Sequence, residues 1–138
     1  MNIDSIQNGV VIDHIHAGFG MKLYTLLKLE SLDAQVAIIM NASSNKMGRK
    51  DIIKIDAQIP IDLDIIGYVD PGATINVIRN GVRVEKYEAS LPLVLTNVIK
   101  CKNPRCISSC EQELPHKFKL TDEENRVYRC IYCETKSS

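Results

Sequence analysis

The sequence predicts an α+β fold: a ferredoxin-like sheet domain with two helices on one face, followed by a small antiparallel β domain that binds zinc. Three observations support this prediction. Strand-like and helix-like segments follow one another in the order βαββαββ between residues 10 and 88. The dipeptide Asn80-Gly81 marks a two-residue hairpin between the last two strands. Four cysteines then follow as two separated pairs near the end of the chain.

The first half of the predicted sheet domain contains a strand, a helix and a second strand. Residues 10–16 begin with three β-branched apolar residues, and polar residues occur only from Asp13 onward, which is typical of a strand. Residues 21–29 have the spacing of a helix with a wide apolar face that includes Met21. Residues 35–40 predict a largely buried strand, and the polar residues 41–45 are expected to form a loop.

The second half adds a third strand, a helix and the hairpin. Residues 50–58 alternate imperfectly between polar and apolar side chains, which favours a strand. Pro60 opens the next segment, and residues 61–68 have helical spacing with acidic residues in the first turn, where the helix dipole favours them. Residues 73–79 and 82–88 are the two hairpin strands. An antiparallel-rich sheet is therefore expected.

A short connector separates the sheet domain from the cysteine-bearing segment. Pro92 lacks a backbone donor and stiffens the path, so we place the domain boundary there, between residues 1–92 and residues 93–138. Within the second segment, residues 117–130 contain two short strands around a polar turn. This segment is too short to build a sizeable core alone, and we expect a bound metal to supply much of its folding free energy.

The cysteine spacing is Cys101-x4-Cys106 and Cys130-x2-Cys133. Two thiolates this close in sequence can point into one concavity of a tight turn, and two such turns supply the four sulfur ligands of a structural zinc site. Two disulfides or four buried free thiols are the alternatives. Disulfides need an oxidising compartment, and nothing in the sequence indicates export to one. One structural zinc ion is therefore the favoured interpretation. Cys110 is a fifth thiol outside this spacing.

Composition argues against several classes of function. The 138-residue chain carries seventeen basic and seventeen acidic residues, which disfavours a nucleic-acid binder with a broad basic surface. Stacking aromatics are few, with two Phe, five Tyr and no Trp. The amino end lacks a cationic segment followed by an apolar run, and no apolar stretch reaches the ~18 residues that span a bilayer. A cytoplasmic protein without membrane contact is expected.

Catalysis by this chain is also not expected. No nucleophile and base stand in a recognisable pattern, and a zinc ion with four cysteine ligands has no open position for water. A stand-alone zinc-ribbon module that binds nucleic acid is one function that the cysteine-bearing segment could have, and it is kept as an alternative.

Five motifs occur in order along the chain: Val11-Ile12-Asp13-His14-Ile15, MGRKDIIKI from Met47 to Ile55, Ala73-Thr74-Ile75-Asn76, Ser90-Leu91-Pro92, and the cysteine pairs with Ile107-Ser108, Tyr132 and Glu134. In these motifs, and over almost its full length, the sequence resembles the regulatory chains of aspartate carbamoyltransferase. The resemblance implies a non-catalytic allosteric chain of pyrimidine biosynthesis. Its amino-terminal domain would bind nucleoside triphosphates (CTP or UTP against ATP) and pair with a second regulatory chain. Its zinc domain would dock on the catalytic chain, so that regulatory dimers bridge catalytic trimers.

The resemblance also implies a nucleotide site. Asp13 and His14 would meet the base and sugar, while the ammonium groups of Lys50, Lys54 and Lys86 would cradle the triphosphate. The remaining residues of the implied site are Asn76, Ile78, Val11, Asp4 and Ile6. From the residues alone, a polar pair at a strand end is the favoured interpretation of Asp13 and His14, and a solvated sheet face is that of the lysines.

Two positions depart from the family pattern. Gly81 stands where the family often has an aromatic residue, and Arg83 stands where an apolar residue helps to line the pocket. Arg83 either adds a phosphate contact or points to solvent. The sequence therefore predicts triphosphate binding without predicting the preferred nucleotide or the sign of its effect.

Overall fold

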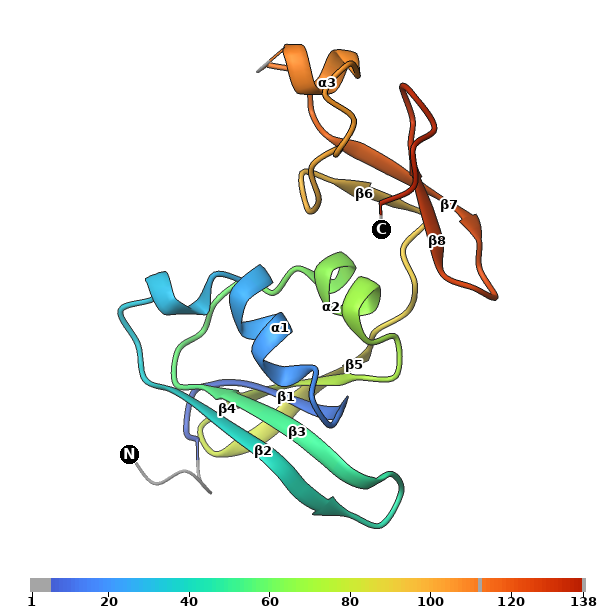
Figure 1. Ribbon diagram of the computed structural model, residues 1–138. Coiled ribbons are helices and arrows are strands. Elements are labelled where there is room, and N and C mark those ends of the chain that lie inside the picture. The colour runs from blue at the N-terminus through green and yellow to red at the C-terminus, as the bar shows by residue number, and fades with distance from the viewer. Residues whose placement is uncertain (1–5, 112, 138) are drawn as a thin grey trace. The chain divides into compact units, whose positions relative to one another are not determined.

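The computed structural model of the chain describes residues 6–111 and 113–137. The chain divides into two compact units, Met1–Ser90 and Leu91–Ser138 (Figure 1). Each unit has its own sheet, of five strands in the first and three in the second.

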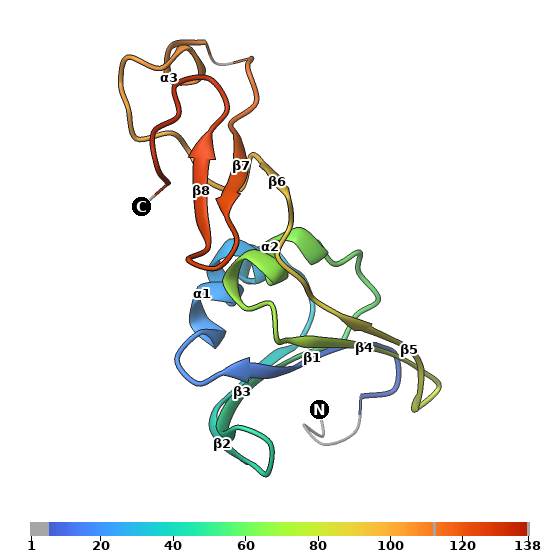
Figure 2. The ribbon, with the colours of Figure 1, turned by 90° about the vertical axis from the view of Figure 1, so that its right-hand side faces the viewer.

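The first unit is an antiparallel sheet with helices on one face. The strands are β1 (Gly9–His16), β2 (Val36–Ser44), β3 (Gly48–Ile55), β4 (Thr74–Arg79) and β5 (Val82–Glu88). Their order across the sheet is β2-β3-β1-β4-β5, and every neighbouring pair is antiparallel. Figure 2 shows α1 (Gly20–Leu26) and α2 (Leu63–Val69) on the same side of these strands. The predicted α+β sheet with two helices on one face is confirmed.

The core of this unit lies between the sheet and the helices. Side chains alternate between the two faces of a strand, so every second residue of the central strands points toward the helices. Ile12, Ile53 and Ile75 occupy such positions on β1, β3 and β4 and are at most 1 % exposed. Leu23 of α1 and Ile66 of α2 pack against them and are fully buried. We call the opposite side, which carries no helix, the open face.

The first helix is shorter than the sequence predicts. It ends at Leu26, Lys28 adopts a left-handed backbone with φ of 56°, and a separate 3-10 turn, η1, covers Leu29–Ser31. Met21 was expected on the apolar face but is 46 % exposed, because Leu23, Leu26 and Leu27 form the side of this segment that packs against the core. Within residues 6–111 and 113–137, no helix is long and apolar enough to cross a membrane.

The loop predicted over residues 41–45 is wrong. β2 continues to Ser44, which pairs with Gly48 of β3. The strand accommodates its polar residues by a bulge, where Asn41 takes a φ of 61°. Backbone pairing across a hairpin does not depend on side-chain polarity, so composition alone misplaced the end of this strand.

The second unit contains a three-stranded antiparallel sheet. Its strands are β6 (Val94–Thr96), β7 (Lys117–Asp122) and β8 (Val127–Cys130), in that order, and α3 (Ile107–Cys110) lies between β6 and β7 in sequence. Leu95, Phe118 and Tyr128 form a small core and are at most 1 % exposed. The Tyr128 hydroxyl donates to the Pro92 carbonyl at 2.6 Å. β6 and α3 could not be predicted from the sequence, because they are too short to show a periodic pattern.

Replacing Gly67 by alanine tests the close approach of α2 to residue 90. A Cβ atom at Gly67 would lie 1.9 Å from the Ser90 carbonyl oxygen, so backbone must move. Alanine favours a helix interior by about 1 kcal/mol over glycine, but overpacking against backbone costs more. We expect Gly67→Ala to lower the free energy of unfolding by about 2 kcal/mol, measured by urea denaturation.

Gly72→Ala is the matched control. A Cβ atom there meets only Asp70 and His16 side-chain atoms at 3.4 and 3.7 Å, which are ordinary contacts. Its effect should stay within about 0.5 kcal/mol. Equal effects of the two substitutions would contradict the steric explanation.

Candidate functional site

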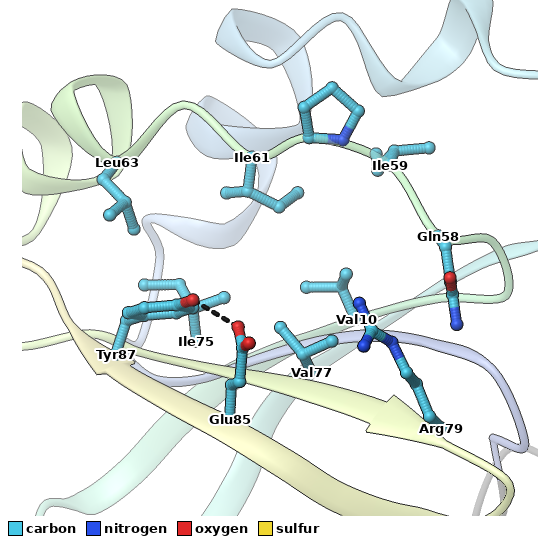
Figure 3. Close-up of a pocket in the computed structure, with 11 residues that line it drawn as sticks. Val10, Gln58, Ile59, Ile61, Leu63, Ile75, Val77, Arg79, Glu85 and Tyr87 are labelled. Atoms are coloured by element: carbon cyan, nitrogen blue, oxygen red, sulfur yellow. Dashed lines mark hydrogen bonds between the residues drawn. The ribbon is translucent and has the colours of Figure 1, made fainter.

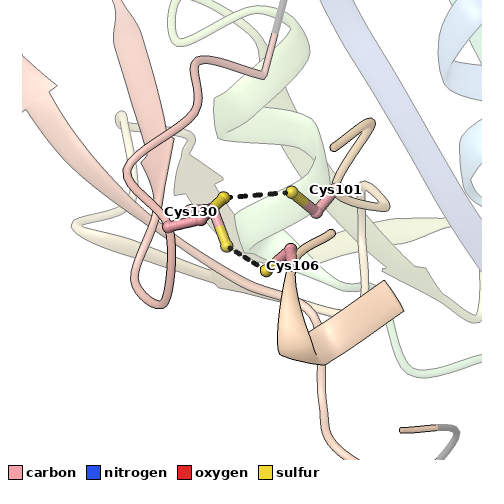
Figure 4. Close-up of side chains that lie close together, drawn as sticks. Cys101, Cys106 and Cys130 are labelled. Carbon is pink, nitrogen blue, oxygen red and sulfur yellow. Dashed lines mark hydrogen bonds between the residues drawn. The ribbon is translucent and has the colours of Figure 1, made fainter. Parts of the chain in front are cut away.

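Four cysteine side chains converge in the second unit, and we call them the cysteine cluster. The Sγ atoms of Cys101, Cys106, Cys130 and Cys133 all lie within 4.8 Å of one another. Cys101 Sγ lies 3.5 Å from Cys133 Sγ. Cys106 Sγ lies 3.6 Å from Cys130 Sγ (Figure 4). These separations far exceed the disulfide bond length of about 2.05 Å, so the structure does not form the two disulfides considered as an alternative.

Two short turns bring the sulfur atoms together. Cys106 is the N-cap residue of α3, and its N–H donates to the Asn103 carbonyl at 3.1 Å. Cys130 is the last residue of β8, where its N–H donates to the Thr135 carbonyl at 3.0 Å. Each cysteine pair therefore spans a turn that its own backbone hydrogen bonds close, one beside α3 and one at the end of the hairpin.

His116 supports the cluster without belonging to it. The backbone N–H of Cys101 donates to His116 Nδ1 at 3.3 Å. The Ser109 hydroxyl donates to the Cys101 carbonyl at 3.3 Å. These contacts hold the segment that carries the first sulfur. His116 lies between the cysteine pairs in sequence, and no spacing rule would have identified its role.

The surroundings shift the pKa values of the thiols in opposite directions. Hydrogen bonding to Thr135 lowers the pKa of Cys133 to about 6, and a hydrogen bond from Ser108 lowers the pKa of Cys106. Burial raises the pKa of Cys101 to about 12. The surroundings of Cys106 and Cys133 thus favour the thiolate, whereas burial of Cys101 favours the protonated thiol, from which metal binding would release a proton.

The cysteine cluster fits a tetrahedral metal ion with sulfur ligands. Zinc–sulfur bonds of about 2.3 Å place the corners of a tetrahedron about 3.8 Å apart, close to the separations observed. Cys110 does not join this set: it is exposed, and its thiol contacts the Pro104 carbonyl at 3.7 Å. The donor set is all sulfur, which suits zinc better than hard cations.

The open face of the first unit gathers most of the residues that the sequence analysis assigned to a nucleotide. Lys54, Val11, Asn76 and Lys86 pair in register across β3, β1, β4 and β5, and form one row on this face. The Asn76 side-chain amide donates to the Val11 carbonyl at 3.5 Å. Residues that are distant in sequence are therefore adjacent across the sheet. Lys54 and Lys86 lie at the two ends of the row, with the uncharged residues Val11 and Asn76 between them.

Asp13 and Lys50 form an ion pair beside this row. Lys50 Nζ lies 2.9 Å from Asp13 Oδ1, and the two side chains are 16 % and 23 % exposed. Partial burial raises the pKa of Asp13, but hydrogen bonds from the Lys50 ammonium and the His14 N–H outweigh it and hold that pKa below the ordinary value of 3.8. The carboxylate is consequently ionised and already oriented.

A bulge in β1 brings the His14 ring to Thr74. The register with β3 shifts between Ile12 and Ile15, and His14 takes a φ of 57°. Its ring Nδ1 lies 2.9 Å from Thr74 Oγ1, which belongs to the strand residue that pairs with Asp13. A role for Thr74 in the site could not be predicted from the sequence, because it depends on the bulge that brings His14 to it.

The remaining assigned residues lie outside this row. Ile78 pairs with Gly9 and with Arg83, one step further along β4. Ile6 is buried, at 7 % exposure, and its side chain approaches Gly9. Gly81 has a φ of 77° and donates its N–H to the Gln7 carbonyl at 2.9 Å. Asp4 lies outside the described residues.

Comparisons with known proteins agree on one family. Residues 1–90 match the family model described as aspartate carbamoyltransferase regulatory chain, allosteric domain, and residues 94–138 match that of the metal binding domain of the same chain. Proteins named aspartate carbamoyltransferase regulatory chain are 54 % identical in Clostridium botulinum and 48 % in Clostridium acetobutylicum, each over 97 % of this chain and 92 % of the relative. The one from Bifidobacterium longum is 43 % identical over 99 % of both chains.

The depressed pKa of Asp13 predicts a pH-dependent contribution to stability. A carboxylate with a lowered folded-state pKa stabilises fully above its ordinary value of 3.8, and this stabilisation is lost as the pH falls through the folded-state pKa. We expect Asp13→Asn to cost about 1 kcal/mol of unfolding free energy near neutral pH and progressively less in acid, measured by urea denaturation. In a Lys50→Met background the same substitution should lose most of its pH dependence. A cost that does not change with pH would contradict the ion pair.

Proposed function

Because the chain belongs to the family of aspartate carbamoyltransferase regulatory chains, we propose that its first unit binds nucleoside triphosphates and that its second unit binds one structural zinc ion. It is a non-catalytic regulatory chain with an allosteric domain and a metal-binding domain. The proposed boundary between the two functions lies at residue 92. The convergence of the four cysteine sulfurs is the observation that carries the zinc assignment.

Zinc would connect the turn before α3 to the end of β8. When bound, the ion supplies four bonds that tie these segments together, with no position left for a substrate. The thiolates of Cys106 and Cys133 receive hydrogen bonds from Ser108 and Thr135, respectively. The free thiol state of these cysteines also fits the reducing cytoplasm, which we propose as the location.

The nucleotide would lie on the open face of the first unit. The ammonium groups of Lys50, Lys54 and Lys86 offer positive charge to a triphosphate, and Asp13 can accept from sugar hydroxyl or base amino groups. The cross-strand row of Lys54, Val11, Asn76 and Lys86 supports this assignment. The ligands that we propose are ATP and the pyrimidine triphosphates CTP and UTP.

The second unit would dock on the catalytic chain. Ile107, Ile131 and Tyr132 lie next to cysteines of the cluster and are 53 %, 45 % and 38 % exposed. Apolar side chains exposed together in a small metal-stapled unit are typical of an interface. We propose that pairs of this chain bridge catalytic trimers, and that a nucleotide shifts the assembly between two states because it binds them with different affinity.

Removing one sulfur tests the zinc and docking proposals together. Cys130→Ser should leave the second unit without stoichiometric zinc and largely unfolded, because metal binding provides much of the folding free energy of such a domain. The expected result is loss of co-purification with catalytic trimers and loss of zinc by elemental analysis. Cys110→Ser is the matched control, since its thiol is exposed and outside the cluster. Assembly of Cys130→Ser at wild-type stoichiometry would refute the proposal.

Lys54→Ala tests the orientation of the nucleotide. Because one charge-assisted contact with a phosphate is lost, the affinity for ATP should fall about tenfold, while the affinity for adenosine should change less than about twofold. Both affinities are measured by calorimetry. Lys22→Ala provides a control, because Lys22 lies in α1 on the helix side, with its Nζ 5.9 Å from the centre of the Tyr68 ring. Equal losses for ATP and adenosine would show that Lys54 does not meet the phosphates.

A further inference from the structure

A cavity of about 510 Å³ opens on the helix side of the first unit, near the β4–β5 hairpin (Figure 3). Val10, Ile75 and Val77 of β1 and β4 form its floor. Its roof is the extended segment 58–63, from which Ile61 and Leu63 point toward the strands. The cavity exists because α2 begins only at Leu63, so that an extended segment and no helix covers this part of the sheet.

This cavity is separate from the proposed nucleotide site. Successive residues of a strand point to opposite faces. Ile75 and Val77 therefore face the cavity, while Asn76 between them faces the open face and joins the row with Lys54 and Lys86. A ligand in the cavity would be separated from a nucleotide by the thickness of the sheet.

Polar groups stand at defined places around the apolar lining. The Tyr87 hydroxyl donates to the Glu85 carboxylate, so this acid is already engaged (Figure 3). Arg79 lines the other end beside Gln58. Within residues 6–111 and 113–137, Arg79 forms no ion pair. The cavity thus combines an apolar floor, in which Val10 and Ile75 are buried, with one cation that forms no ion pair in the described part of the chain.

We propose that this cavity binds a small organic acid, with its apolar body on Ile75 and Val77 and its carboxylate on Arg79. The volume lies within the range of about 300–1,000 Å³ that is typical of small-molecule sites. A guanidinium pairs with a carboxylate through two parallel hydrogen bonds, which orients the acid as well as binding it. This site is additional to the triphosphate site, and neither proposal depends on the other.

Methyl and amide NMR of the full, metal-loaded chain tests the proposal, with hexanoate as the probe and hexanamide as its uncharged counterpart. We expect saturable shifts of the Ile61, Ile75 and Val77 methyl signals with hexanoate, and at least about fivefold weaker binding of hexanamide. Saturating ATP should leave hexanoate bound. Absence of saturable shifts, shifts centred elsewhere, or an apparent hexanoate affinity that falls in proportion to ATP concentration without reaching a plateau would overturn the proposal.

Two arginine substitutions in the β4–β5 hairpin distinguish a direct contact of hexanoate with Arg79 from a general effect of positive charge. Arg79→Gln should weaken hexanoate about tenfold and leave hexanamide binding unchanged. Arg83→Gln removes the same charge from β5 at a residue that does not line the cavity, and its effect should stay below about twofold. Unchanged methyl spectra without ligand will show that both variants fold. Equal effects of the two substitutions would overturn the assignment of Arg79.

Discussion

The side-chain alternation of β1 is the constraint on which the first unit depends. β1 pairs with both β3 and β4, so its register sets the position of the whole centre of the sheet. Val10 and Ile12 face the helices, whereas Val11 and Asp13 face away. A strict period of two would then bury His14. The bulge after Ile12 inserts one residue, so that Ile15 returns to the core and His14 reaches Thr74.

The second unit depends on a different interaction, because its apolar core is small. Three large side chains, Leu95, Phe118 and Tyr128, are fully buried in a segment of fewer than fifty residues. Units of this size seldom fold on hydrophobic burial alone and usually rely on disulfides or a metal. The lowered pKa values of Cys106 and Cys133 favour metal binding, because a metal ion binds the thiolate. The pKa of the buried Cys101 is raised, so metal binding there would be accompanied by release of the thiol proton.

Features with a short-range chemical cause could be predicted from the sequence. Asn80 and Gly81 both take positive φ, at 53° and 77°, as a two-residue hairpin requires. Both cysteine pairs lie in turns, as their spacing indicates. Features that depend on register could not be predicted: the bulges at His14 and Asn41, the contact of His14 with Thr74, and the cavity beneath segment 58–63. Periodicity reports which residues share a face, but not which partners they meet across the sheet.

β4 lies at the centre of both proposed ligand sites of the first unit, to which β1 and β5 also contribute. It contributes Asn76 to the open face, and Ile75 and Val77 to the cavity floor. Its outer neighbour, β5, is exposed along its whole length, so fewer packed side chains hold this edge in place than hold the centre. A ligand on either face that displaces β4 changes the geometry of the other face. Linkage then requires the two ligands to affect each other's affinity equally, and a sheet edge of this kind could therefore transmit a regulatory signal within the unit.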